Sequence, residues 1–273
     1  MKRSALPRPA VLALALVPFL LPAGTGGQDQ AASDLAPLLD GIADRAASYV
    51  PLEGWRASVR TVQTKVDKSW NPEKVTTVSR VVTVRKDDYD ERILKAEEAE
   101  KGRTKDITAD YARDSLERIE KRRREAAERK AKGEAASGDE GGRREMSLKE
   151  FLPFDRARRA DFDFARLPDA TVDGAAAIVL EVRARVKDEK NWEGTYFIAP
   201  ERLDILKVVL RPSKNPRFVK ELEMEMAVLV LPGDHLVLRS SRARINAGMF
   251  LKRVRMISED EYSDYEILPE DPK

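Results

Sequence analysis

The chain has 273 residues, with 50 basic and 48 acidic side chains, one histidine and no cysteine. The lack of cysteine excludes disulfides, thiol catalysis, cysteine metal sites and a lipid-modified cysteine anchor, and one histidine excludes a histidine-rich metal site. Balanced charge without an extended basic stripe does not favour nucleic-acid binding.

Residues 1–27 have the pattern of an export signal. Lys2, Arg3 and Arg8 form a basic start, and an apolar run of 14 residues follows from Ala10 to Ala23. A membrane span needs about 20 apolar residues, and this run is shorter and contains two prolines. The pattern predicts a signal peptide cleaved between about residues 23 and 28 and a mature protein in the periplasm. An uncleaved N-terminal anchor is the alternative.

A helix and two or three strands are predicted next. Apolar residues recur at helical spacing from Leu35 to Tyr49, which predicts an amphipathic helix over 34–49 beginning after Ser33. Valine and threonine are frequent beyond it and favour strands. The predicted strands are Trp55–Val66, Val75–Arg85 and Tyr89–Lys95, with a turn at Asn71-Pro72.

The segment 101–145 holds 14 basic and 11 acidic residues and few large apolar ones. Acid-then-base pairs four residues apart favour a solvated helix, with a weak apolar face at Ala109, Ala112, Leu116 and Ile119. Glycines indicate a flexible loop after Lys132. We interpret the segment as a charged helical and flexible insertion. Arg122, Arg123 and Arg124 are candidates for contact with a partner or anionic lipid, and a plain solvated helix is the alternative.

The segment from Phe151 to Leu268 predicts a meander of long antiparallel strands. The strands are Asp161–Leu167, Ala177–Lys187, Gly194–Ala199, Leu203–Arg211, Phe218–Leu231, Leu236–Ile245 and Phe250–Ile257. Turn signals lie at Pro168-Asp169, at Leu231–Asp234 and at Asn246–Gly248.

The most informative strand is the one after Phe218. Leu222, Met224, Met226 and Val228 alternate with glutamates at 221, 223 and 225, so one face is apolar and the other is charged. Such a sheet needs a cover on its apolar face, and the helix over 34–49 is the simplest one.

This layout resembles the outer-membrane lipoprotein-sorting proteins, the LolA/LolB-like periplasmic carriers and their relatives. The similarity is carried by Glu193–Lys207, by Arg244-Ile-Asn-Ala-Gly248 and by Tyr262-Ser-Asp-Tyr265. Ala199 stands where the group usually has aspartate, and the insertion and missing cysteine also depart from it. The resemblance implies an α+β fold: a curved antiparallel half-barrel, an unclosed β-barrel covered by helices. It also implies one domain over 33–268 and a short tail over 269–273.

In the carriers the cavity of the half-barrel accepts acyl chains, so the resemblance implies a hydrophobic ligand site. Burial of an acyl chain stabilises a complex by about 0.8 kcal/mol per methylene, and methionine adapts to varied ligands. The alternative is that these residues are ordinary core. The candidate lining residues are Phe218, Leu222, Met224, Met226, Val228 and Phe250.

Enzyme signatures are weak. His235 follows a turn, and neither Ser240 nor Ser241 lies in a nucleophile elbow. Carboxylate clusters at 87–91, 221–225 and 259–261 lack EF-hand spacing, although a carboxylate calcium site and a carboxylate-based hydrolase stay open.

The sequence therefore predicts a non-enzymatic periplasmic protein without a cofactor. Its predicted role is to bind a lipid or lipoprotein acyl chain in lipoprotein sorting or envelope lipid transport. An envelope protein-interaction or signalling module on the same fold is the alternative.

Overall fold

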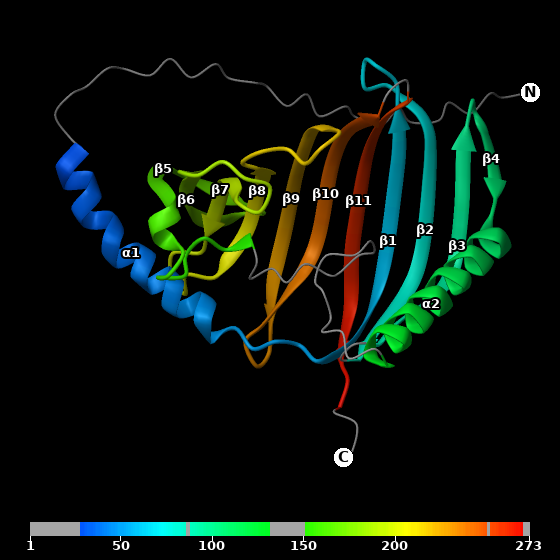
Figure 1. Ribbon diagram of the computed structural model, residues 1–273. Helices are drawn as coiled ribbons and strands as arrows, with labels where there is room; N and C mark the ends of the chain where they lie inside the picture. The colour runs from blue at the N-terminus through cyan, green and yellow to red at the C-terminus, as the bar shows by residue number, and fades with distance from the viewer. Residues whose placement is uncertain (1–27, 86–87, 132–150, 250–251, 270–273) are drawn as a thin grey trace, which may run out of the picture. The chain divides into compact units, whose positions relative to one another are not determined.

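The computed structural model describes residues 28–85, 88–131, 151–249 and 252–269 (Figure 1). Contacts divide the chain between Asp34 and Leu35, and the fold below is that of the part after this boundary. The predicted signal peptide over 1–27, the predicted loop after Lys132, Phe250 and residues 270–273 lie outside the described residues.

The described residues contain two α-helices and eleven strands, and all the strands join one antiparallel sheet. The helices are α1 (Gln28–Ser48) and α2 (Thr108–Ala131), and a 3₁₀ turn, η2, spans Arg159–Asp161. The strands are β1 (Gly54–Val66), β2 (Pro72–Arg85), β3 (Asp88–Glu100), β4 (Arg103–Asp106), β5 (Phe162–Val172), β6 (Ala175–Ala184), β7 (Trp192–Ile198), β8 (Ile205–Pro212), β9 (Val219–Leu231), β10 (His235–Met249) and β11 (Lys252–Ile267).

The strand order is β4-β3-β2-β1-β11-β10-β9-β8-β7-β6-β5. Because β4 and β5 are the two free edges, the sheet is unclosed, and the predicted α+β fold with an unclosed antiparallel sheet and helices is confirmed. The last strand, β11, lies between β1 and β10 (Figure 1). The N-terminal and C-terminal parts of the chain therefore share one sheet.

Two predicted turns lie inside strands. Pro168 and Asp169 belong to β5, at a register shift between Leu167 and Ala170. Proline is tolerated there because β5 is an edge strand and its outer side needs no N–H donor. The chain reverses instead at Asp173-Gly174, where both residues have positive φ, 50° and 85°.

The second misplaced turn is Asn246–Gly248. These residues continue the ladder of β10, where Asn246 pairs with Arg255 and Gly248 with Arg253. Pairing with β9 extends as far as Ala247, so tertiary pairing overrides the local turn signal. The predicted strand Ala177–Lys187 is also shorter in the structure, because β6 ends at Ala184 and Val186 is 61% exposed.

Cross-strand partners share a face of the sheet, so the pairing defines its two faces. We call the face that carries the main core the inner face and the opposite face the outer face. Each row below follows paired residues from strand to strand on one face. The inner row is Leu180, Tyr196, Val208, Met226, Ser241, Asp260, Thr61 and Val78. The outer row is Val179, Phe197, Lys207, Ala227, Ser240, Glu261, Arg60 and Ser79.

The main core lies on the inner face of β5 to β9, beneath α1. Leu39, Ile42 and Ala43 of the helix are buried against side chains such as Leu180 and Tyr196. Gly41 allows a close approach, because a Cβ there would lie 2.6 Å from Leu203 Cδ1. The helix begins at Gln28, before the predicted start, because the alanines at 31 and 32 favour continuation.

The segment Phe151–Phe154 fills the rest of this core. Phe151, Leu152 and Phe154 are buried, and the Phe154 ring meets Tyr196 edge-on at a centroid distance of 5.1 Å. The Tyr196 hydroxyl donates a hydrogen bond to the Phe151 carbonyl at 2.6 Å. The part of the inner face beneath α1 is therefore a packed core.

Candidate functional site

The inner face changes character across the sheet. On β5 to β9 it is a packed core. On β9 to β11, around Leu222, Ile245 and Met256, it is a half-buried apolar strip. On β1 to β3, around Arg80 and Glu91, it is a buried polar cluster. The strip and the cluster are the candidate sites, because neither is explained by packing beneath α1.

Polar contacts fix the second half of α1. Near its end, Arg45 Nε lies 2.6 Å from the Asp204 carboxylate, and the Tyr49 hydroxyl donates to the same carboxylate at 3.2 Å. Further back, Arg159 contacts Asp40 at 2.8 Å. The helix is thus tied to segments far away in sequence, and its position over the core is specified.

The apolar strip is built from two rows of cross-strand partners. Leu222 pairs with Ile245, which pairs with Met256. Met224 pairs with Ala243 in the next row. All five side chains are half-buried. The strip continues along β9 into Met226 and Val228, which are only 5% and 6% exposed.

A polar cluster occupies the same face on β1 to β3 and β11. Arg80 is 3% exposed, and its Nε lies 3.1 Å from Glu91, although the angle is too poor for a hydrogen bond. A second carboxylate, Asp260, lies 4.0 Å from Arg80. Asp260 also accepts hydrogen bonds from Thr61 and from Ser241, the latter at 3.3 Å.

Glu91 is the centre of this cluster. Burial pushes the pKa of Glu91 upward, but hydrogen bonds from Ser115 and Tyr89 and the charge of Arg80 outweigh it, so the pKa lies below its usual value. The Tyr89 hydroxyl donates at 2.9 Å and Ser115 donates from α2. The carboxylate is therefore charged and satisfied, which describes a structural ion pair rather than a catalytic acid.

α2 packs along β3 over this cluster (Figure 1). Thr108 Oγ1 donates to the Ala96 carbonyl and accepts from the Ala96 N–H, and Ser115 and Ile119 are buried. The helix face toward the sheet thus follows Ala112, Ser115 and Ile119. Ala112 and Ile119 of the predicted apolar face lie toward the sheet, but Leu116 does not, because it is 54% exposed.

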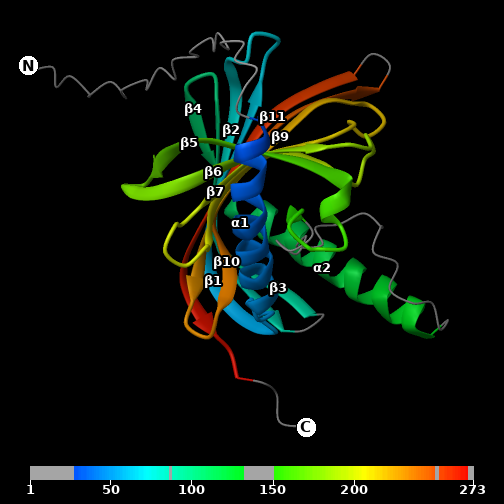
Figure 2. The same ribbon diagram turned by 90° about the vertical axis from the view of Figure 1, so that its left-hand side faces the viewer.

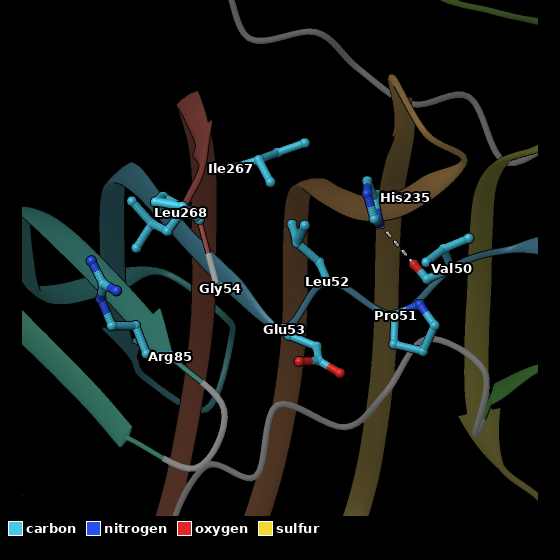
Figure 3. Close-up of a pocket in the computed structure, with 10 residues that line it drawn as sticks. Val50, Pro51, Leu52, Glu53, Gly54, Arg85, His235, Ile267 and Leu268 are labelled. Atoms are coloured by element: carbon cyan, nitrogen blue, oxygen red, sulfur yellow. Dashed lines mark hydrogen bonds between the residues drawn. The ribbon is translucent and has the colours of Figure 1, made fainter. Parts of the chain in front are cut away.

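A small pocket lies where the segment after α1 meets the ends of β2 and β11. Its volume is about 280 Å³, and Val50, Leu52 and Leu268 form apolar walls. Leu52 points into the space between Leu268 and His235 (Figure 3). His235 Nδ1 lies 3.1 Å from the Val50 carbonyl, so this nitrogen carries the proton and donates it.

The geometry excludes a triad of His235 with Ser240 or Ser241. Ser240 and Ser241 lie five and six residues further along β10, about 17 to 20 Å away at 3.3 Å per residue. Ser241 instead donates to Asp260 on the inner face. Among the described residues no group of three acidic or histidine side chains could hold a metal ion.

The predicted ligand residues fall into three environments. Met226 and Val228 belong to the packed core, while Leu222 and Met224 lie on the apolar strip. Phe218 precedes β9 and is 46% exposed. Phe250 is outside the described residues.

Two of the three predicted partner arginines contact this chain itself. The Arg122 guanidinium lies 5.9 Å from the centre of the Tyr89 ring. Arg123 makes two hydrogen bonds to Asp88, at 3.0 and 3.2 Å. Arg124 is exposed. Two of the three arginines therefore help to attach α2 to β3.

Sequence reasoning missed Ile245 and Met256 of the strip and Arg80 of the cluster. Val254 and Met256 do alternate along the chain, which is a strand signal. Their position beside Leu222, however, depends on pairing between strands distant in sequence. Arg80 carries no local signal of burial in a strand rich in valine and threonine.

No protein-family model and no curated protein sequence matches the chain. Solved structures do match. A putative outer-membrane lipoprotein-sorting protein domain from Vibrio parahaemolyticus is 10% identical over 84% of this chain and 91% of its own, with a TM-score of 0.34. A LolA superfamily protein from Nitrosomonas europaea is 10% identical over 85% and 94%, with a TM-score of 0.31.

A complex of MucA and MucB from Pseudomonas aeruginosa also matches. It is 8% identical over 88% of this chain and 100% of the matched chain, with a TM-score of 0.25. The matches thus include the lipoprotein-sorting group that the sequence resembles.

In the described part of the chain, no helix combines the length and apolar character needed to cross a membrane.

Proposed function

We propose that this protein is a non-enzymatic binding protein, exported to the periplasm, that holds an acyl chain of a lipid or lipoprotein against the apolar strip of β9 to β11. It would act in outer-membrane lipoprotein sorting or envelope lipid transport. The basic and apolar pattern of residues 1–27 supports export.

The observation that carries the proposal is the half-buried state of the strip. Leu222, Ile245 and Met256 share one face of three neighbouring strands, and the strip runs about 13 Å along β9 to Met226 at 3.3 Å per residue. An acyl chain would cover this surface with a gain of about 0.8 kcal/mol per buried methylene.

The polar cluster fits the same proposal as a boundary. Arg80, Glu91 and Asp260 lie on the same face, and an acyl chain gains nothing from contact with them. The ligand surface would therefore end before Asp260 on β11 and extend from there along the strip to Leu222, Ile245 and Met256.

The test compares two isoleucines of neighbouring strands on opposite faces. Ile245 lies on the strip, and Ile257 is half-buried on the outer face, paired with Arg244. Uptake of a fluorescent fatty acid by the mature chain is measured by titration and native mass spectrometry. Ile245→Glu should weaken uptake at least about tenfold, because a buried charge opposes an apolar ligand. Ile257→Glu should bind like the wild type.

Circular dichroism checks that both variants are folded. A wild type that takes up no acyl probe, or two variants with equal losses, contradicts the carrier function. The first result would favour the second candidate, an envelope protein-interaction module. The feature that favours this module is the exposed side of α2, with Leu116 and Arg124.

A further inference from the structure

The hairpin of β10 and β11 extends beyond its neighbours. β9 begins at Val219, opposite Ala247, and the last β1 residue paired with β11 is Lys65, opposite Met256. Residues 248–249 of β10 therefore lie past the ladder with β9, and residues 252–255 of β11 lie past the ladder with β1. The hairpin can be followed in Figure 2 as the orange and red strands.

Positive charge is concentrated in the two chain segments that form the tip. The segments 214–220 and 247–257 contain six lysines and arginines and no acidic residue, whereas the whole chain has 50 basic and 48 acidic residues. Arg217, Lys220 and Arg253 are exposed. These two segments therefore offer an approaching anion positive charge and no carboxylate of their own.

Two large apolar side chains are exposed among these bases. Phe218 is 46% exposed and Val254 is 51% exposed. The Arg217 guanidinium lies over the Phe218 ring, 4.7 Å from its centre. The Gly248 N–H donates to the Phe218 carbonyl at 2.9 Å, so Phe218 is attached to the hairpin.

The backbone at Phe218 is strained. Its φ is 70°, a left-handed conformation that bulky residues rarely adopt. Such strain persists where the surrounding structure imposes it, and it is frequent at functional sites. At Phe218 the strained backbone carries an aromatic side chain that is exposed to solvent.

We propose that the basic tip, formed by Arg217, Phe218, Lys220, Arg253, Val254 and Arg255, docks the protein on an anionic phospholipid bilayer. Phe218 and Val254 enter the interface between headgroups and acyl chains, and the bases contact the phosphates. An anionic bilayer is favoured as the occupant because a protruding tip that combines exposed apolar groups with six bases in its two segments matches its surface. This role goes beyond acyl binding and does not depend on it.

The test is sedimentation of the mature chain with vesicles. Vesicles of phosphatidylglycerol and phosphatidylethanolamine should bind the protein at least about tenfold better than phosphatidylcholine alone, because each base near an anionic surface adds attraction. Raising NaCl from about 0.05 to about 0.5 M should weaken binding, since the screening length shortens.

Two double variants separate charge from apolar contact. Arg217→Glu with Arg253→Glu should reduce binding at least about tenfold, and Phe218→Ser with Val254→Ser should reduce it several-fold. Matched controls lie elsewhere: Arg92→Glu with Lys105→Glu, and Leu94→Ser with Val186→Ser, at residues that are also exposed.

The controls should sediment like the wild type. No sedimentation of the wild type with the anionic vesicles would overturn the docking role. Equal losses in tip and control variants would overturn it too, since binding would then reflect general charge or general apolar exposure.

Discussion

Asp204 connects three side chains at the end of α1. Its carboxylate contacts Arg45 at 2.6 Å and Arg202 at 3.2 Å, and it accepts the Tyr49 hydroxyl at 3.2 Å. The Ile205 N–H donates to the Tyr49 oxygen at 3.3 Å. Tyr49 is 3% exposed, so its hydroxyl must stay protonated to donate to Asp204. This residue therefore couples the position of α1 to pH.

Tyr49 predicts a loss of stability in alkali. Burial, with a contribution from Asp204, raises the pKa of Tyr49 from 10.0 to about 12. The folded state holds this proton more tightly, so the stabilisation is complete below pH 10 and is lost as pH rises from 10 to 12. The loss attributable to Tyr49 should reach about 1.4 kcal/mol by pH 11.

Urea unfolding of the wild type and Tyr49→Phe between pH 8 and pH 11 checks this. The phenylalanine variant should be less stable at pH 8, because it lacks the two hydrogen bonds, and the difference from wild type should shrink towards pH 11. Parallel curves for the two proteins would contradict the assignment.

At the scale of elements, α2 is attached through the ion pair beneath it. Ser115 donates to Glu91, and Glu91 faces Arg80, which is 3% exposed. Removing one partner of such a pair leaves an uncompensated buried charge. The polar cluster therefore specifies where α2 lies along β3, and a change at Glu91 affects both elements.

Glu91→Gln should destabilise the fold by about 3 kcal/mol. Glu97→Gln is the matched control on the same strand, since Glu97 contacts Lys95 at an exposed site, and it should cost less than about 1 kcal/mol. Urea unfolding measures both. The low pKa of Glu91 means that its stabilisation is present above its usual pKa and is lost as pH falls through the folded value.

In Glu91→Gln this acid-dependent part should disappear, and amide exchange in α2 should accelerate because the helix loses its anchor. Equal stability of the two glutamine variants would show that Arg80 is compensated by Asp260 alone.

Local patterns predicted most elements, and long-range pairing decided the rest. Alternation along Leu222 to Val228 predicted β9, and the spacing from Leu35 to Tyr49 predicted α1. The prediction of a turn at Asn246 was wrong, because β10 stays paired with β9 and β11 at this residue. The burial of Arg80 was not predictable, because the helix that covers it begins about 30 residues later in the chain.

At the scale of the whole molecule, the pairing of β1 with β11 joins two apolar clusters. Trp55 is 7% exposed in a cluster with Ala57, Val59 and Val82 on β1 and β2. Trp192 packs against the main core beneath α1, with its ring 5.1 Å from Phe151. Because both clusters lie on one continuous sheet, we propose that residues 33–268 unfold as one domain.

The three tryptophans allow a direct test of this single domain. One variant keeps only Trp55 (Trp70→Phe with Trp192→Phe), and the other keeps only Trp192 (Trp55→Phe with Trp70→Phe). In each variant the urea transition followed by tryptophan fluorescence should coincide with the transition followed by far-UV circular dichroism. Coincidence is expected because loss of β11 leaves β1 and β10 each with one unpaired edge, so the two halves of the sheet lose the strand that joins them. A fluorescence midpoint that departs from the dichroism midpoint in either variant would instead divide the chain into two independently unfolding parts.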